Sequence, residues 1–394
     1  MKNALWPSVA LKQFMGGRGK SVNPVLYPDE EFDLFSVPAY DSGLPDHVTG
    51  NQIGSTKQVV EPDDVLLSKI VPHIRRAWIV PRKGSRRMIG SSEWMIFSGN
   101  NLHPPFLRHY FLTDSFNQQL MLTVSGVGGS LLRARPSHVG EIPLPLPPLR
   151  EQKRLAAILD QADAIRRKRQ QSLRLTDDFL RSVFLDFFGD PVTNPKGWPE
   201  IRLGDVIQEG PQNGLYKPST EYGSGTPILR IDAFYDGVVR AEASLKRLRL
   251  SPEDKSLYLL REGDIVVNRV NSLEYLGKSA IIPRFSEEIV FESNIMRMSM
   301  DRLRFEPRFI VAMLQTQHIK RQIKICAKQA VNQASINQSD VKSFRIFEPP
   351  MALQRDYVRT IEQLEKLQRK QVRHLAEAET LFQSLQCRAF TGQL

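Results

Sequence analysis

The chain has very little cysteine and no long apolar run. Cys326 and Cys387 are the only cysteines among 394 residues, which argues against a disulfide framework and excludes a four-cysteine zinc site. No apolar stretch approaches the ~20 residues of a membrane span, and the opening MKNALWPSVALKQF lacks the apolar core of a signal peptide. The seven histidines form no cluster with metal-ligand spacing. These absences predict a cytoplasmic protein without a membrane span or a metal of its own.

Acidic residues are outnumbered by basic ones. The chain has 54 Lys and Arg against 43 Asp and Glu, which gives a formal net charge of +11 and a pI of about 9.6. Such a balance favours a polyanionic partner, nucleic acid first, and the alternative is a basic surface that only maintains solubility. The length suggests two or three domains, at about 150 residues each.

The sequence carries no convincing catalytic motif. Gly16–Ser21 (GGRGKS) resembles a phosphate-binding loop but lacks its first glycine, because Phe14 occupies that position. His103–Phe106 (HPPF) resembles an amino-methyltransferase motif, yet histidine replaces the required Asn or Asp. A helix start with proline in its first turn explains these residues better. Acidic clusters such as Pro28–Glu31 lack the spacing of a metal nuclease and are typical of turns and helix caps.

What the sequence does contain is an internal repeat. Residues 147–188 align without a gap on residues 349–390, at an offset of 202 positions (349 − 147). Both copies begin with a Pro-Pro pair. Other matched pairs are Gln152 and Gln354, Gln161 and Gln363, Leu173 and Leu375, and Phe188 and Phe390. A repeat of this length predicts a chain built from two similar halves.

Both copies are predicted to be long helices of about 35 residues, or roughly 50 Å. Neither contains a proline or glycine between the Pro-Pro pair and its end. In both, a stripe of residues recurs at alternating steps of four and three, the heptad pattern of a coiled coil, and turns polar in the middle. The main seam positions are Leu155, Leu159, Leu173 and Leu180 in the first copy and Ile361, Leu364, Leu375 and Phe382 in the second. We expect the two helices to pair with each other; the alternative is that each packs only on its own domain.

The segments that precede the helices resemble each other faintly. Trp6–Leu11 (WPSVAL) echoes Trp198–Leu203 (WPEIRL), and Glu61–Ile70 echoes Arg261–Val270. Short β-branched runs bounded by Gly, Pro and Asp predict strands. Helical stretches are expected at 106–122 and 307–328. The predicted fold class is α+β, with two mixed α/β domains, each followed by a long helix, and approximate internal two-fold symmetry.

Candidate nucleic-acid contacts lie at corresponding places in the two segments. Arginine reads guanine, and asparagine reads adenine, through paired hydrogen bonds in the major groove. The alternative for each residue is a phosphate contact or a plain surface position. The candidates are Arg75, Arg76, Lys83, Arg86 and Arg87 in the first segment and Asn268, Arg269 and Asn271 in the second.

The chain resembles the specificity subunits of type I restriction–modification systems. The strongest signature is IPLPLPPLREQKRLAAILDQAD at 142–163, which returns in weaker form at 346–366. The ending AFTGQL at 389–394 and the openings WPSVAL and WPEIRL are also similar to that family. GDIVVNRV at 263–270 resembles a run inside its recognition domains, whereas the counterpart at 63–70 has an aspartate in place of the glycine.

The resemblance implies target-recognition domains at 1–146 and 191–348, a central long helix at 147–190 and a C-terminal long helix at 349–394. Each domain would read one half of a split site in double-stranded DNA. The two helices, paired as an antiparallel coiled coil, would hold the domains apart and set the unread spacer.

The resemblance also implies that this chain is not itself an enzyme and holds no cofactor. Two modification subunits would dock on the helices and methylate adenine with S-adenosylmethionine. Motor–nuclease restriction subunits would join them for cleavage, using ATP and Mg.

Two other classes of function stay open at this point. One is an enzyme that acts alone, either a nuclease or a methyltransferase, which turnover by the purified chain would reveal. The other is a coiled-coil scaffold that binds no nucleic acid, which a failure to bind any DNA in the presence of partner subunits would favour.

Overall fold

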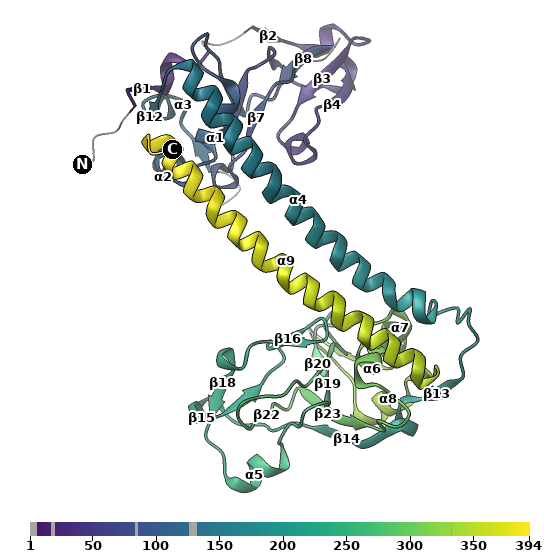
Figure 1. Ribbon diagram of the computed structural model, residues 1–394. Coiled ribbons are helices and arrows are strands. Elements are labelled where there is room, and N and C mark those ends of the chain that lie inside the picture. Colours follow the sequence, from purple (N-terminus) through teal and green to yellow (C-terminus); the bar gives the residue numbers. More distant parts are fainter. Residues whose placement is uncertain (1–5, 17–19, 83–85, 126–131, 332) are drawn as a thin grey trace. The chain divides into compact units, whose positions relative to one another are not determined.

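The computed structural model describes residues 6–16, 20–82, 86–125, 132–331 and 333–394 (Figure 1). The chain forms two compact units. The first consists of Met1–Ser172 together with Gln371–Leu394, and the second is Leu173–Lys370. The first unit therefore combines two segments that are far apart in the sequence.

The first unit is built on a three-stranded antiparallel sheet in the order β7-β6-β9. Its strands are β6 (Val65–Ser68), β7 (Ala77–Ile79) and β9 (Trp94–Phe97). All four residues of the central strand β6 are buried. The helices α1 (Pro104–Phe111) and α2 (Asp114–Leu122) follow it, and their phenylalanines join Phe97 in one hydrophobic core.

A five-stranded sheet in the order β2-β5-β8-β3-β4 completes the first domain. Its strands are β2 (Ser21–Val22), β3 (Glu31–Phe35), β4 (Asp46–Thr49), β5 (Lys57–Val59) and β8 (Arg87–Gly90). Two small antiparallel pairs are β1 (Ser8–Ala10) with β12 (Pro143–Pro145), and β10 (Val124–Ser125) with β11 (Arg133–Ala134). The short helices are α3 (Pro136–Val139), η1 (Leu11–Gln13), η2 (Pro24–Leu26), η3 (Pro38–Ser42), η4 (Gly50–Gln52) and η5 (Pro72–Ile74).

The second unit is built on a four-stranded antiparallel sheet in the order β14-β23-β19-β21. Its strands are β14 (Ile207–Asn213), β19 (Ile265–Asn268), β21 (Ser279–Ile281) and β23 (Ile295–Met300). The helices α6 (Pro307–Leu314) and α7 (Gln317–Cys326) follow β23 in the chain. Their apolar residues share a core with β19 and β23.

Smaller elements surround this sheet. The remaining strands are β13 (Glu200–Arg202), β15 (Tyr222–Leu229), β16 (Phe234–Tyr235), β17 (Val238–Val239), β18 (Lys246–Leu248), β20 (Val270–Asn271), β22 (Val290–Phe291), β24 (Lys328–Ala330), β25 (Gln333–Ser335) and β26 (Arg345–Phe347). The remaining short helices are α5 (Pro252–Leu257), α8 (Gln338–Ser343), η7 (Leu203–Val206), η8 (Ser219–Glu221) and η9 (Glu242–Ser244).

The two units share a framework in the same chain order. The strands β6, β7 and β9 correspond to β19, β21 and β23, since each triplet forms an antiparallel sheet with its first strand in the centre. In both units two helices follow, and a closing strand, β12 or β26, pairs with the opening strand. The faint sequence similarity between the two segments thus reflects a common arrangement of elements.

The helical stretches expected after the last framework strand are present in both units, each divided into two helices. Two helices stand in each place, and α1 begins at Pro104, two positions before the expected start. The break falls at Thr113 and at Thr316, whose hydroxyls accept hydrogen bonds from the backbone N–H of Phe116 and Ile319. A threonine that caps a new helix start replaces the lost helical hydrogen bonds, so the chain can turn there.

The two long helices start where the Pro-Pro pairs predict. Helix α4 runs from Leu149 to Phe188 over 40 residues, and α9 runs from Met351 to Thr391 over 41 residues. Both exceed the expected ~35 residues and span about 60 Å at 1.5 Å per residue.

A buried glutamine joins α4 to the first domain. Gln152 is fully buried, and its amide oxygen accepts a hydrogen bond from His103 N at 2.9 Å. Its amide nitrogen donates to Asn101 O at 3.0 Å and to Pro147 O at 2.9 Å. All three partners precede the helix, so this one side chain ties the start of α4 to the loop that enters α1.

The same junction recurs in the second unit. Gln354 is fully buried and accepts a hydrogen bond from Glu306 N at 3.0 Å. Its nitrogen donates to Arg304 O at 3.1 Å and to Pro349 O at 2.8 Å. The matched pair of glutamines found in the sequence therefore marks one structural device used twice.

The opening tryptophans hold the far ends of the helices. In the first unit, Trp6 Nε1 donates to Ala389 O of α9 at 3.2 Å. In the second unit, Trp198 Nε1 donates to Phe188 O of α4 at 2.8 Å. A carbonyl in the last turn of a helix lacks an intrahelical partner, so each indole satisfies a group that would otherwise be unpaired.

The aspartate that replaces a family glycine keeps the glycine's backbone conformation. Gly263 has φ +85°, and its counterpart Asp63 has φ +72°. Aspartate tolerates this left-handed region better than most residues. Its carboxylate also lies 2.7 Å from the guanidinium of Arg82. The departure from the family pattern is thus a conservative one.

The glutamine junction makes a stability prediction. Gln354→Ala removes three hydrogen bonds from a buried site and leaves their partners unpaired, so we expect a loss of about 1–3 kcal/mol in the free energy of unfolding. Gln363→Ala, at an exposed position of the same helix, is the matched control. Urea denaturation of the full chain measures both, and equal midpoints for the two variants would contradict the role of the junction.

Candidate nucleic-acid interface

The loop between β6 and β7 holds two of the predicted arginines in the first unit. Ser68 N donates to Arg76 O at 3.0 Å and closes this loop. The Arg75 guanidinium lies 2.6 Å from a carboxylate oxygen of Asp114. Arg76 is largely buried, with 13% of its side chain exposed, and its Nε lies 3.5 Å from a carboxylate oxygen of Asp41. Both arginines therefore face acidic neighbours in the same unit.

The other predicted basic residues of this unit lie at the start of β8. Arg86 lies 2.5 Å from a Glu31 carboxylate oxygen, and this hydrogen bond holds the pKa of the Glu31 carboxyl below its usual value. Arg87 lies 3.8 Å from Glu30, and its guanidinium stands 5.4 Å from the centre of the Tyr27 ring. Lys83 lies outside the described residues. These exposed ion pairs are screened by solvent and contribute little to stability, so a phosphate can exchange for the carboxylate.

The prediction that Asn268 contacts DNA is contradicted. Asn268 ends the central strand β19 and is completely buried. Among the described residues, neither its amide oxygen nor its amide nitrogen has a hydrogen-bond partner. A side chain between two sheet neighbours in the core is not accessible to a base edge.

The other two candidates of the second unit lie just after β19. Arg269 Nη1 donates to Ser293 O at 3.1 Å. Asn271 is half-buried, and its side-chain oxygen accepts a hydrogen bond from Ser272 N at 2.8 Å. Their loop, residues 269–278, corresponds to the β6–β7 loop, because Asn268 N donates to Lys278 O at 2.8 Å as Ser68 N does to Arg76 O.

Sequence reasoning missed the aromatic group around Lys278. The Lys278 ammonium lies 3.8 Å from the centre of the Tyr235 ring and 5.0 Å from that of Phe234. Burial lowers the pKa of this lysine. The offset of 202 found in the repeat would have located Lys278, because Arg76 occupies the same place in the first unit and 278 − 76 is 202. Tyr235 of β16 and Tyr275 of the loop keep 41% and 44% of their surface exposed, so rings from two elements surround one cation.

A polar cleft of about 1140 Å³ lies within the first unit. Arg75 and Trp78 line it from the domain, and Arg166, Arg167 and Phe382 line it from the helices. The arginines on α4 are held by Asp163, at 2.7 and 2.5 Å. Burial alone raises the pKa of Asp163, but the hydrogen bonds from both arginines outweigh it and keep the pKa below its usual value. Paired charges therefore form part of the wall of the cleft.

None of the eight predicted seam positions of α4 and α9 is exposed, although only two of them are fully buried. Leu155 and Leu159 are fully buried, and Phe382 packs against their cluster in the first unit. In the second unit, Ile361 and Leu364 pack against a cluster that contains Phe184 of α4. Half-buried seam positions are Leu173, Leu180, Ile361, Leu364, Leu375 and Phe382.

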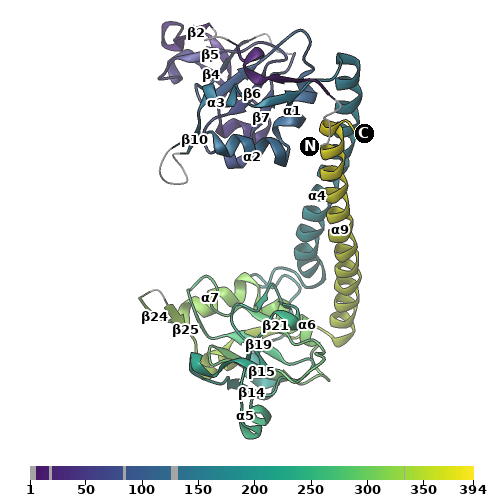
Figure 2. The ribbon, with the colours of Figure 1, turned by 90° about the vertical axis from the view of Figure 1, so that its left-hand side faces the viewer.

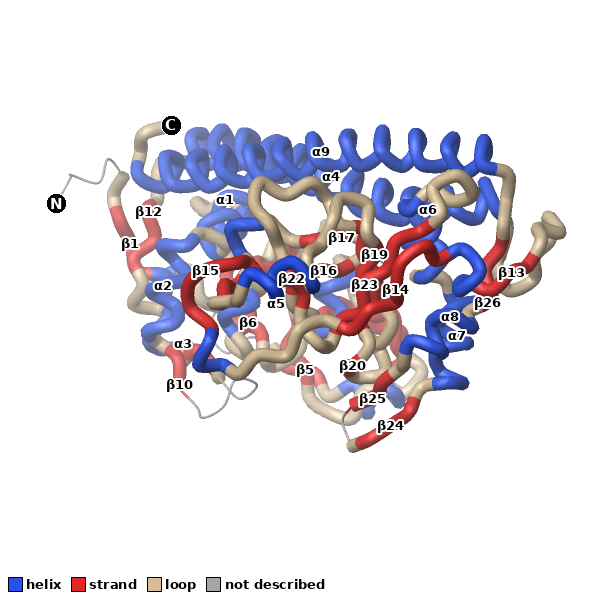
Figure 3. The backbone as a smooth tube through the Cα atoms, turned by 90° about the horizontal axis from the view of Figure 1, so that it is seen from below, coloured by secondary structure: helices blue, strands red, loops and turns tan. Residues whose placement is uncertain are grey.

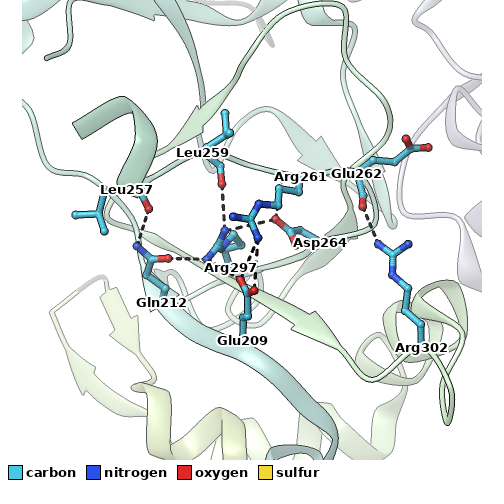
Figure 4. A network of polar contacts seen from close by, with 9 residues as sticks. All are labelled: Glu209, Gln212, Leu257, Leu259, Arg261, Glu262, Asp264, Arg297 and Arg302. Carbon is cyan, nitrogen blue, oxygen red and sulfur yellow. Dashed lines mark hydrogen bonds and ion pairs between the residues drawn. The ribbon is translucent and has the colours of Figure 1, made fainter. Parts of the chain in front are cut away.

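A buried ionic network supports the second unit (Figure 4). Arg297 on β23 donates to Leu259 O at 3.1 Å and to the side-chain oxygen of Gln212 at 2.8 Å. The carboxylates of Glu209 and Asp264 lie 3.7 and 3.8 Å from its guanidinium. Burial raises the pKa of Asp264. The network ties β14, β23 and the segment before β19 together, which makes it part of the scaffold that holds loop 269–278.

Residues 195–378 match the type I restriction modification DNA specificity domain. The EcoKI specificity subunit of Escherichia coli (strain K12), a type I restriction enzyme subunit, is 25% identical over 322 residues, which are 77% of this chain and 67% of the relative. The StySPI specificity subunit of Salmonella potsdam is 25% identical over 309 residues, or 74% of this chain and 66% of the relative. The alignments thus span about two thirds of these relatives.

The fold is shared with a solved structure. A chain from a structure described as the basis of complex assembly and conformational transition of the type I R-M system is 21% identical and has a TM-score of 0.62. The match covers 99% of this chain and 98% of the other. The resemblance to specificity subunits and the mixed α/β fold with long helices, both expected from the sequence, are confirmed.

Two other kinds of feature are absent from the described part of the chain. No helix there is both long and apolar enough to cross a membrane. No three His, Cys, Asp or Glu side chains of those residues gather in a way that could hold a metal ion.

The ionic network leads to a second stability prediction. Arg297→Leu leaves the Asp264 carboxylate buried without its ion-pair partner, while the hydrogen bond from Arg261 N at 2.8 Å remains, and loss of such a partner typically costs about 3–5 kcal/mol. Arg302→Leu is the control, because Arg302 is exposed and donates only to Glu262 O at 2.7 Å. Thermal unfolding of the full chain should show a clearly lower transition for Arg297→Leu alone. Similar transitions for both variants would mean that the network is dispensable.

Proposed function

We propose that the chain is the DNA-recognition subunit of a multisubunit type I restriction–modification complex in the cytoplasm. The observation that carries this proposal is a framework used twice with different loops. Each unit contains the same three-stranded framework and the same glutamine junction to a long helix. The loops at 69–76 and 269–278 differ in sequence, as expected of two readers with different targets. Similarity to specificity subunits supports it.

Under this proposal each domain, 1–146 or 191–348, reads one half of a bipartite site in double-stranded DNA. The net charge of +11 suits a DNA partner. Arg75 and Arg76 remain candidate contacts in the first domain, together with Lys83, Arg86 and Arg87, while Arg269 and Asn271 remain in the second. Paired arginines such as Arg86 are suited to phosphate contacts, because a phosphate replaces the carboxylate at little cost.

We also propose that α4 and α9 pair as an antiparallel coiled coil with approximate two-fold symmetry. The buried and half-buried seam positions support this pairing, and so does the hydrogen bond from Gln371 Nε2 to Ser172 Oγ at 3.2 Å. Such a pair would hold the two domains at a fixed separation and set the length of the unread spacer.

Catalysis belongs to partner subunits in this proposal. Two modification subunits dock on the helices and methylate adenine with S-adenosylmethionine, and restriction subunits that use ATP and Mg cleave the DNA. This chain determines which DNA site the complex binds, so the site that the complex methylates or cleaves should depend on its recognition domains.

A domain exchange tests the reading of two half-sites. Replacing residues 1–146 by the corresponding domain of another specificity subunit should change one half of the methylated site and leave the other half unchanged. Methylome sequencing of cells that carry the complex gives both halves directly. A change in both halves would contradict independent reading, and an unchanged site would contradict recognition by this chain.

The helix pairing has its own test. Leu364→Asp places a charge on the half-buried seam, at a cost of several kcal/mol unless it is paired, so we expect loss of the assembled complex. Leu367→Asp is the matched control on the same helix, since Leu367 is 48% exposed. Size-exclusion chromatography with the modification subunits distinguishes the two variants. Normal assembly of Leu364→Asp would reject the seam as a pairing surface.

A further inference from the structure

A β-ribbon extends from the second unit. Helix α7 leads through Ala327 into β24, which pairs with β25, and β25 pairs in turn with β20. Figures 2 and 3 agree that β24 and β25 lie on the side of this unit opposite to α9. The ribbon therefore lies on the side of the unit that faces away from α9.

The base of the ribbon is fixed by packing. Ala334 of β25 is 3% exposed and belongs to the same core cluster as Ile319 and Ile323 of α7. Gly277 lets Ile323 approach closely, because an added Cβ there would lie 2.1 Å from Ile323 Cδ1. Ile336 N also donates to Arg269 O at 3.0 Å. A ribbon with such a base can hold side chains in defined positions.

The strand register separates the ribbon into two faces. Residues directly opposite each other on paired strands project to the same face, and neighbours alternate. Gln329 pairs with the buried Ala334, so both project toward the core side. Lys328 pairs with Ser335, and Ala330 with Gln333, on the opposite face. The outer face thus offers exposed Lys328 and Gln333 beside two small residues.

Free cations continue this surface onto α7. Lys320, Arg321 and Lys324 are exposed at steps that place them on one side of the helix. Within the described residues, none of these three side chains has a carboxylate within ion-pair distance. The same is true of Lys328. Arg75 and Arg86 of the first unit, by contrast, are paired with carboxylates.

The corresponding helix of the first unit lacks this charge. Helix α2 reads DSFNQQLML and contains no lysine or arginine, whereas α7 reads QHIKRQIKIC. The framework positions of the two helices agree, including their threonine caps. A basic face present on only one of them is a property of that domain's target and not of the shared fold.

We infer that the β24–β25 ribbon enters the major groove of the half-site read by the second domain, with Gln333 as a base-reading residue. The inference rests on the proposed function. The major groove is wide enough for a two-stranded ribbon, and glutamine pairs with the N6 and N7 atoms of adenine. Lys328 and the three α7 cations bind the flanking phosphates. Val331, which is 92% exposed, meets a thymine methyl group or the sugar edge.

Substitution of Gln333 tests the base contact. The methylated site is first mapped in cells, and the complete methyltransferase complex is then assayed on duplexes with each base of that site replaced in turn. Gln333→Ala should reduce discrimination by about tenfold to a hundredfold at one adenine of the second half-site, with the first half-site unaffected. Gln329→Ala, on the core-side face of the ribbon, should keep the discrimination of the parent.

The outcome that overturns the inference is a Gln333→Ala profile equal to that of Gln329→Ala. If Gln333→Ala does not assemble, Gln333→Glu decides instead, because it keeps the size of an exposed side chain. Glutamate cannot donate to adenine N7 and should lower methylation of the parent site at least tenfold. Unchanged methylation by that variant would reject Gln333 as a reader.

Salt dependence tests the phosphate contacts separately. Each lost phosphate contact lowers the slope of log K against log salt by about 0.9, so the triple variant Lys320→Ala, Arg321→Ala, Lys324→Ala should lose about 2.7. The recognised bases should stay the same. An unchanged slope would remove α7 from the interface.

Failure of the ribbon and failure of the proposed function give different results. If exchange of residues 191–348 changes one half-site while the Gln333 variants change nothing, another part of the second domain reads the DNA and the ribbon inference is wrong. If that exchange leaves the whole methylated site unchanged, the chain is not the reader, and the proposed function is wrong with it.

Discussion

Each long helix carries one stripe of seam residues that has to be shielded from water, and the rest of the chain is arranged around that requirement. An isolated helix of this kind is marginal in water. In the first unit, Leu155 and Leu159 near the start of α4 are fully buried in a domain core. In the second unit, the other end of α4 is buried through Phe184 and Phe188. Between these ends the stripe is polar, and Arg169 is exposed. The helices are therefore stabilised mainly at their ends, where the buried glutamines and the indole hydrogen bonds also lie.

The features that the sequence predicts well are those that repeat or that have a local cause. The Pro-Pro starts of α4 and α9, the absence of helix breakers and the heptad stripe all act within a few residues, and the structure follows them. Gln152 and Gln354 were visible as matched positions, but two of the three hydrogen bonds that each makes reach back about 50 residues. The turns at Thr113 and Thr316 were missed, because threonine caps a helix only when the surrounding core favours a turn there.

The loops that carry the candidate contacts could be located in the sequence, but the packing of their side chains could not. Arg76 and Lys278 occupy one position in the two domains, and the loops that contain them were expected to carry the contacts. Burial excludes Asn268 as a contact. Its side chain, at the end of β19, lies in the core, and no local sequence pattern reveals this. The partner of Arg86, Glu31, lies 55 residues away. Pairings over such separations depend on strand order, and strand order was not deducible from the short apolar runs.

The composition of the first unit has a consequence for synthesis of the chain on the ribosome. Its domain is made first, but the segment Gln371–Leu394 that completes it follows the 198 residues of the second unit (370 − 172). At about 5–20 residues per second, that interval lasts on the order of 10–40 s. During it, the aromatic surface that receives Phe390, including Phe106 and Tyr110, stays uncovered. The domain that is translated first is thus completed last. A nascent chain halted in α9 would contain nearly all of the second unit, while the first unit would still lack its C-terminal segment.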